Sequence, residues 1–122
     1  MIRILAVDDD KDILEILQYI LEDSGYQVNT LSNGTYFMEN IIVSKPDLIL
    51  LDVMLGGMDG RELCKCAKSL KETHDIPVIL ISASHDVSDS LKETWGPDDF
   101  IAKPFDIDVL LASVKRQLQN AA

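Results

Sequence analysis

The sequence predicts one α/β domain over residues 1–122, with a doubly wound, five-stranded parallel sheet. The first observation is that short apolar runs alternate with segments of helical spacing five times along the chain. The second is the unbroken apolar run at residues 48–51, which is typical of a strand buried on both faces. The third is the length of 122 residues, which suits one core. Each crossover between parallel strands should be right-handed.

The first half of the chain supplies two strands and two helices. Residues 2–7 predict a strand and residues 11–24 a helix, which an aspartate of the run 8–10 can cap and which Gly25 can end. The apolar stripe predicted for this helix is Ile13, Ile16, Leu17, Ile20 and Leu21. Residues 27–31 predict the second strand and residues 35–43 a short helix, separated by the turn signal at 32–34.

The second half repeats the pattern from the apolar run onward. The third strand ends at Asp52, and the glycines at 56, 57 and 60 predict a loop before a helix over 61–71. A fourth strand is predicted over 77–81, a polar helix over 86–95 and a fifth strand over 100–102. Asp98 and Asp99 are expected to cap and solvate the turn before that strand. Asp106 can cap the last helix, with the stripe Val109, Leu110, Val114 and Leu118.

Composition narrows the classes of function. The formal net charge of −10 disfavours direct nucleic-acid binding by this domain. No apolar run approaches the roughly 20 residues of a membrane span, and no signal peptide is visible, which favours the cytoplasm. Cys64 and Cys66 are the only cysteines, and without further Cys or His pairs they are interpreted as free thiols rather than zinc ligands.

Polar residues follow four of the predicted strands at the point where each strand ends. Asp8 and Asp9 follow the first strand, Asp52 ends the third, Ser82 and Ala83 follow the fourth, and Lys103 follows the fifth. Ligand sites in open α/β sheets lie beyond the carboxyl ends of the strands. We therefore expect these side chains to meet at one edge of the sheet.

The predicted cluster has a definite chemistry. Two carboxylates ~4 Å apart repel by roughly 4 kcal/mol at an effective dielectric of 20, so the site needs cations. Lys103 supplies one, and hard oxygen ligands favour Mg²⁺ or Mn²⁺ for the rest. A carboxylate in this setting can attack phosphorus and form an aspartyl phosphate. The expected contacts to the phosphoryl oxygens are Lys103, Ser82 and the backbone N–H groups of Val53 and Ala83.

Taken in order, these residues resemble the receiver domain of two-component response regulators, the CheY-like superfamily, over nearly the whole chain. The matching motifs are Asp8-Asp9, Asp52, Ser82-Ala83 and Lys103-Pro104. The resemblance implies the flavodoxin-like strand order 2-1-3-4-5. It also implies a signalling module that assists its own phosphorylation and dephosphorylation, not an enzyme with other substrates.

The resemblance also implies roles for individual residues. Asp52 would accept phosphate from a phosphohistidine of a sensor kinase or phosphotransfer protein. Asp9 would bind Mg²⁺ directly, Asp8 mostly through water, and Asp52 and the carbonyl of Met54 would complete the protein ligands. Lys103 would pair with Asp52 and precede a cis peptide bond to Pro104. Ser82 and Phe100 would act as a switch, and the signal would leave through the face formed by helix 86–95, strand 100–102 and the last helix.

Three other hypotheses are weighed against the receiver. A haloacid-dehalogenase-like phosphatase would use Asp8 as its nucleophile, because Asp8 and Asp10 offer a D-x-D motif. A degenerate receiver would serve only as a docking module, which the intact set of motifs disfavours. A flavodoxin-like cofactor carrier is disfavoured because three aspartates after the first strand repel phosphate. The cognate kinase, the downstream effector and a homodimer formed on phosphorylation are left undetermined by the sequence.

Overall fold

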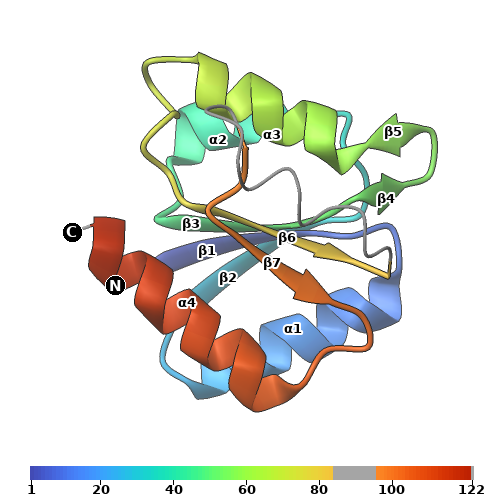
Figure 1. The fold of residues 1–122 in the computed structure, drawn as a ribbon, viewed down its shortest axis with the longest axis vertical. Helices are drawn as coiled ribbons and strands as arrows, with labels where there is room; N and C mark the ends of the chain where they lie inside the picture. Colours follow the sequence, from blue (N-terminus) through green and yellow to red (C-terminus); the bar gives the residue numbers. More distant parts are fainter. Residues whose placement is uncertain (84–95, 122) are drawn as a thin grey trace.

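The computed structural model describes residues 1–83 and 96–121 as a five-stranded parallel sheet with helices on both faces (Figure 1). The strand order is β2-β1-β3-β6-β7, which is the predicted order 2-1-3-4-5 for the successive strands of this sheet. The elements are β1 (Arg3–Val7), α1 (Lys11–Asp23), β2 (Gln27–Leu31), α2 (Phe37–Ser44), β3 (Leu48–Asp52), β4 (Met54–Leu55), β5 (Met58–Asp59), α3 (Gly60–Ser69), β6 (Val78–Ser82), β7 (Asp99–Ala102) and α4 (Ile107–Ala121).

The predicted elements within the described residues are confirmed, with bounds that agree within two residues. The predicted helix over 86–95 lies outside the described residues. The turn region at 54–59 was expected as a loop, but it forms a two-stranded antiparallel hairpin, β4–β5. A positive φ of 66° at Gly56 allows the tight turn between these strands.

Alternation along the strands divides the core into two halves. Leu5, Val7, Ile49 and Leu51 face α2 and α3, whereas the residues between them face α1 and α4. Figure 1 shows these two helix pairs on opposite sides of the sheet. All five residues of β3 are buried, as the apolar run predicted for a central strand.

The predicted helix stripes are partly corrected. Ile16 on α1 and Val109 on α4 are 47% and 56% exposed, and Leu14 is buried in the core instead of Ile16. Asp10 caps α1 by accepting from the N–H groups of Asp12 and Ile13. Asp106 caps α4 through the N–H groups of Asp108 and Val109, so both predicted caps are confirmed.

Asp98 and Asp99 do not cap and solvate a turn, so that prediction was wrong. Asp98 accepts from Lys68 Nζ at 2.7 Å and from the N–H of Val78 at 2.8 Å, which ties α3 and β6 to the start of β7. Asp99 pairs with Arg116 at 2.5 Å and also accepts from the Ser113 hydroxyl, both on α4. Asp98 therefore joins elements that are distant in sequence, whereas Asp99 joins β7 to the helix that follows it.

Candidate functional site

Three carboxylates meet at the carboxyl edge of the sheet. Asp8 and Asp9 follow β1, and Asp52 ends the neighbouring strand β3, whose Leu51 is in register with Val7. One ligand oxygen from each carboxylate lies within 4.8 Å of the other two. Asp8 and Asp52 are 1% and 3% exposed, whereas Asp9 is exposed to solvent. The predicted acidic cluster is thus assembled by the parallel pairing of β1 with β3.

Lys103 brings an ammonium group to the same edge from β7. Its Nζ lies 3.0 Å from Asp8 Oδ2 and 3.4 Å from Asp52 Oδ1. Its backbone N–H donates to the carbonyl of Ser82 at 2.9 Å, which continues the pairing of β6 with β7. The expected pairing with Asp52 is present, but the shorter contact is to Asp8. The Lys103–Pro104 peptide is cis, as the resemblance implied.

Burial and charge act on this cluster in opposite directions. Burial, and then the charge of Asp8, raise the pKa of Asp52, although Lys103 and the N–H of Met54 partly offset this. Burial alone would lower the pKa of Lys103, but its contacts with Asp8 and Asp52 outweigh burial and raise it. Lys103 is therefore held in its charged form, and an ionised Asp52 carries an electrostatic cost.

The donor set fits a hard divalent cation. Among the described residues, three converging carboxylates face one ammonium group, so the ionised cluster has an excess of negative charge. Oxygen ligands of this kind suit Mg²⁺ or Mn²⁺ better than softer metals. Asp9 offers its carboxylate on the solvent side, where a metal ion that keeps several waters needs room.

The two backbone N–H groups that follow Asp52 donate to different acceptors. The N–H of Val53 donates to the carbonyl of Ile81 at 3.1 Å, because the pairing of β3 with β6 continues one residue past Asp52. The N–H of Met54 is the one that donates to the Asp52 carboxylate. The Val53 N–H is thus bound to Ile81 and the Met54 N–H to the carboxylate, and the expected contact of Val53 with a phosphoryl group stays a prediction.

Ser82 and Phe100 lie on the two strands beyond β3. Ser82 is buried at the end of β6, and Ala83 follows it on the surface. Phe100 is partly buried and packs against the core half that lies under α2 and α3. The predicted switch requires a second position of these side chains, so it stays a prediction.

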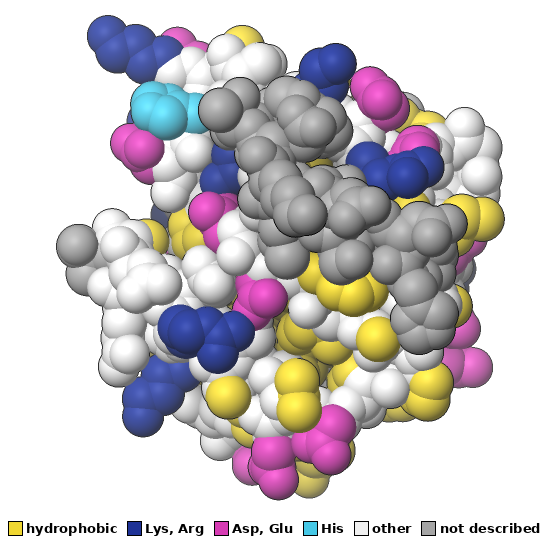
Figure 2. Space-filling view, in the orientation of Figure 1, with side chains coloured by type: hydrophobic (Ala, Val, Ile, Leu, Met, Phe, Trp, Pro, Cys, Tyr) yellow, Lys and Arg dark blue, Asp and Glu magenta, His cyan; other side chains and the backbone are white. Residues whose placement is uncertain are grey.

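Two surface cavities differ in their relation to the cluster. One, of about 520 Å³, adjoins the cluster and is lined by Ile13, Ile16, Ala83, Lys103, Pro104, Phe105 and Ile107. Figure 2 shows hydrophobic side chains gathered between β7 and α1, on this side of the molecule. Apart from Lys103, its lining is apolar.

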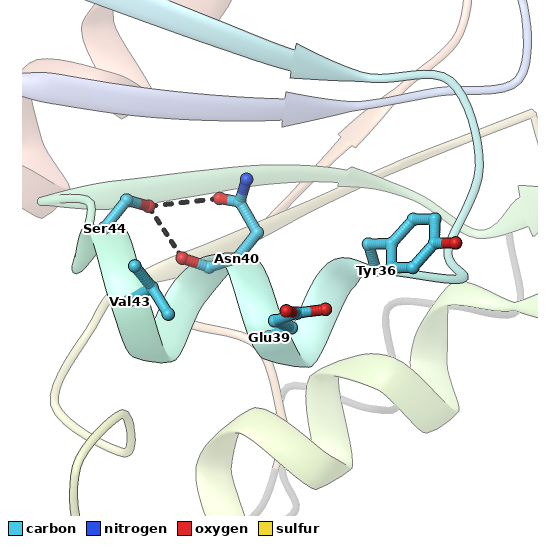
Figure 3. Close-up of a pocket in the computed structure, with 5 residues that line it drawn as sticks. All are labelled: Tyr36, Glu39, Asn40, Val43 and Ser44. Atoms are coloured by element: carbon cyan, nitrogen blue, oxygen red, sulfur yellow. Dashed lines mark hydrogen bonds between the residues drawn. The ribbon is translucent and has the colours of Figure 1, made fainter.

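The other cavity, of about 260 Å³, lies over α2 and the residue before it. Figure 3 shows Tyr36, Glu39 and Val43 along this helix, with the Ser44 hydroxyl donating to the carbonyl of Asn40 at 2.7 Å. None of the three clustered carboxylates lines it.

Among residues 1–83 and 96–121, no helix has the length and the apolar character that a membrane span requires.

Comparison with known proteins gives one consistent result. The family model for the response regulator receiver domain matches residues 4–115. A receiver domain of a signal transduction histidine kinase from Syntrophus aciditrophicus is 39% identical, with a TM-score of 0.89, and the match covers 98% of this chain and 92% of that one. A CheY-like receiver domain protein from Methanospirillum hungatei is 30% identical, with a TM-score of 0.90 and coverage of 99% and 96%.

A longer protein also contains a similar domain. NtrX from Brucella abortus is 32% identical with a TM-score of 0.85, and the match covers 99% of this chain but 28% of NtrX.

Proposed function

Since the chain belongs to the response regulator receiver domain family, we propose that it accepts a phosphoryl group on Asp52 from a phosphohistidine of a two-component phosphorelay. The observation that carries this proposal is the position of Asp52 beside both Asp8 and Lys103 at the carboxyl edge of the sheet. The expected donor is a sensor histidine kinase or a phosphotransfer protein.

The side chains divide the work of the transfer. A carboxylate oxygen of Asp52 forms the bond to phosphorus, the P–N bond to the donor histidine breaks, and the bonding electrons stay with the imidazole. Lys103, which already lies 3.4 Å from Asp52, is placed to pair with the phosphoryl oxygens. The Ser82 hydroxyl and the N–H groups of Met54 and Ala83 are the remaining candidate donors to those oxygens.

A divalent ion, Mg²⁺ or Mn²⁺, would be held by Asp8, Asp9, Asp52 and the carbonyl of Met54. When bound, it would neutralise the negative charge that gathers as a phosphoryl group approaches the carboxylates. The two buried carboxylates and the exposed Asp9 would supply oxygen ligands for it.

The donor protein must reach a nucleophile that is 97% buried. The apolar cavity shares Lys103 and Ala83 with the phosphoryl site, so a donor helix lying in it would hold its histidine at the entrance. We therefore propose this cavity as the seat of the donor protein. The signal would leave through β7, α4 and the predicted helix over 86–95. Its receiver would be an effector protein, a second copy of the chain, or a domain attached to this one, since the match to NtrX covers only 28% of that longer protein.

The phosphatase hypothesis, with Asp8 as nucleophile, is less well supported. Asp8 uses both oxygens, one accepting from the N–H of Asp10 at 2.9 Å and the other from Lys103 at 3.0 Å. The docking-only hypothesis would leave the clustering of all three carboxylates with Lys103 unexplained. A cytoplasmic setting follows from the proposed exchange with a kinase.

Incubation with Mg²⁺ and acetyl phosphate, followed by intact mass measurement, tests the proposal. We expect one phosphoryl group on the wild type and none on Asp52→Ala. Asp23→Ala is the matched control, because Asp23 is an aspartate at the far end of α1 and outside the cluster. Phosphorylation that persists in Asp52→Ala but disappears in Asp8→Ala would favour the phosphatase hypothesis instead.

A further inference from the structure

The first residue of α3 lies against the main chain of the proposed phosphoacceptor. Gly60 is buried, and its N–H donates to the carbonyl of Val53 at 2.8 Å. A Cβ placed on Gly60 would lie 2.1 Å from the carbonyl oxygen of Asp52 and 3.0 Å from the Cα of Val53. Contacts between a Cβ and an oxygen are not found at 2.1 Å, so only glycine fits here without a shift.

The backbone atoms of Asp52 and Val53 that face Gly60 are held in place by the sheet. The atoms that the added Cβ would meet belong to the backbone, which cannot rotate away as a side chain can. Asp52 is paired with Ile81 in the sheet, and the N–H of Val53 donates to Ile81 at 3.1 Å. A larger residue at position 60 must therefore displace either the start of α3 or the end of β3.

The hairpin β4–β5 passes the same displacement to the surroundings of the carboxylate. Asp59, directly before Gly60, is paired with Met54 across the hairpin. Asp59 also caps α3 through the N–H of Arg61 at 2.9 Å and binds the guanidinium of Arg61 at 2.8 Å. Because the N–H of Met54 donates to the Asp52 carboxylate, the start of α3 is linked to that carboxylate through the hairpin as well as directly.

We infer that Gly60 is a positioning residue for the reaction at Asp52: the close approach that it allows fixes the direction of the Asp52 carboxylate and of the Met54 N–H. This inference rests on the proposed function. Gly60 touches no substrate, so it acts only through the main chain of Asp52 and Val53. Its effect should therefore appear in the rate of the chemical step.

Three glycine-to-alanine variants separate positioning from stability. Gly60→Ala is the test. Gly57→Ala, in the turn of the same hairpin, is the first control, because an added Cβ there meets nothing within 4 Å. Gly34→Ala is the second control: its Cβ would lie 2.8 Å from Leu63 Cδ1 and 2.9 Å from Met58 Sδ, which are ends of side chains on α3 and β5. These side chains can rotate away without moving the main chain, so this variant strains packing but does not push on the backbone of Asp52.

The measurements are the rate of phosphorylation at varied acetyl phosphate, the rate of loss of the phosphoryl group, and the melting curve. For Gly60→Ala we expect the saturating phosphorylation rate to fall roughly 10- to 100-fold, with little change in the half-saturating concentration, because a small misplacement of a reacting group costs about this much. Loss of the phosphoryl group should slow as well. Gly57→Ala and Gly34→Ala should keep both rates, although Gly34→Ala should melt at a lower temperature.

Unchanged rates in a folded Gly60→Ala would overturn the inference, as would a rate loss in Gly34→Ala of the same size. If Gly60→Ala is unfolded in buffer, the rates are measured in trimethylamine N-oxide, which favours compact states. A variant that stays unfolded there would assign Gly60 a purely structural role and also overturn the inference. A wild type that is not phosphorylated on Asp52 would instead refute the proposed function.

Discussion

At the scale of single residues, the site is a set of charges that the fold forces together. Asp52 is buried beside Asp8, and this raises its pKa, so keeping it ionised has a cost. Lys103 offsets part of that cost, because its Nζ lies 3.0 Å from Asp8 and 3.4 Å from Asp52. In the proposed transfer, this raised pKa makes the Asp52 carboxylate more basic and therefore a better nucleophile toward phosphorus.

The two cysteines provide a residue-scale prediction, because their surroundings differ sharply. Cys64 is buried, and burial raises the pKa of its thiol to about 12, whereas Cys66 is exposed. Only a thiolate reacts readily with alkylating reagents. We expect the native protein to take up one equivalent of iodoacetamide at pH 8, on Cys66, measured by intact mass.

Cys66→Ser is the matched control for that experiment. It should take up no reagent while folded and one equivalent, on Cys64, after unfolding in guanidinium chloride. Rapid modification of Cys64 in the native protein would contradict the buried position of its side chain.

The residues at the strand ends were predictable from the sequence, but their finer contacts were not. Asp8, Asp52 and Lys103 each follow an apolar run directly, and parallel strands place such residues at one edge. The Met54 N–H donates to the Asp52 carboxylate and the Val53 N–H to Ile81, and this depends on how far the pairing of β3 with β6 continues. The partners of Asp98 lie on α3 and β6, at a distance in sequence that local patterns do not cover.

At the scale of elements, two exposed isoleucines, one on α1 and one on α4, belong to the surface proposed for the donor protein. Ile16 and Ile107 are 47% and 51% exposed, yet both line the cavity beside Lys103. A regular spacing of apolar residues predicted that Ile16 packs in the core. The spacing identified the helix correctly, but it overestimated the width of the buried face. In the sequence, an apolar residue on an exposed surface cannot be distinguished from one that packs in the core.

Ile16→Ser tests the donor surface, with Ile42→Ser as control. Both residues are partly exposed isoleucines, but Ile42 lies on α2 and does not line the cavity. With a sensor kinase that phosphorylates the wild type, we expect Ile16→Ser to slow transfer about tenfold, which corresponds to a loss of roughly 1.4 kcal/mol of donor binding.

Acetyl phosphate serves as the second donor in this test, because it needs no protein surface. Its reaction should be equally fast in the wild type and both variants. An Ile16→Ser variant that accepts phosphate from the kinase at the wild-type rate would show that the donor lies elsewhere.

The hairpin β4–β5 marks the limit of prediction at this scale. The glycines at 56 and 57 predicted a turn, and a Gly-Gly pair between two strand-like runs is typical of a β-hairpin. The flanking strands are two residues each, too short to show alternation. Their pairing became evident only from the structure, and with it the link from Met54 to the start of α3.

At the scale of the whole molecule, the acidic edge couples the proposed activity to stability. The unfolded chain has no reason to hold Asp8, Asp9 and Asp52 together, whereas the folded chain brings their oxygens within 4.8 Å. A divalent ion that bridges them therefore binds the folded state preferentially. Such a ligand stabilises the folded state by RT ln(1 + [L]/Kd), or about 2.7 kcal/mol at 100 times Kd.

We therefore expect Mg²⁺ to raise the melting temperature by several degrees, and the rise should increase with the logarithm of its concentration above Kd. Asp9→Asn should lose most of this shift, because it removes an exposed ligand without disturbing the contacts of Lys103. Asp12→Asn is the matched control, since Asp12 is an exposed aspartate of α1 outside the cluster, and it should keep the full shift. Mg²⁺ must be compared with Na⁺ at equal ionic strength, because a chain with a net charge of −10 is stabilised by screening alone. Equal melting curves in the two salts would show that the three carboxylates hold no divalent ion.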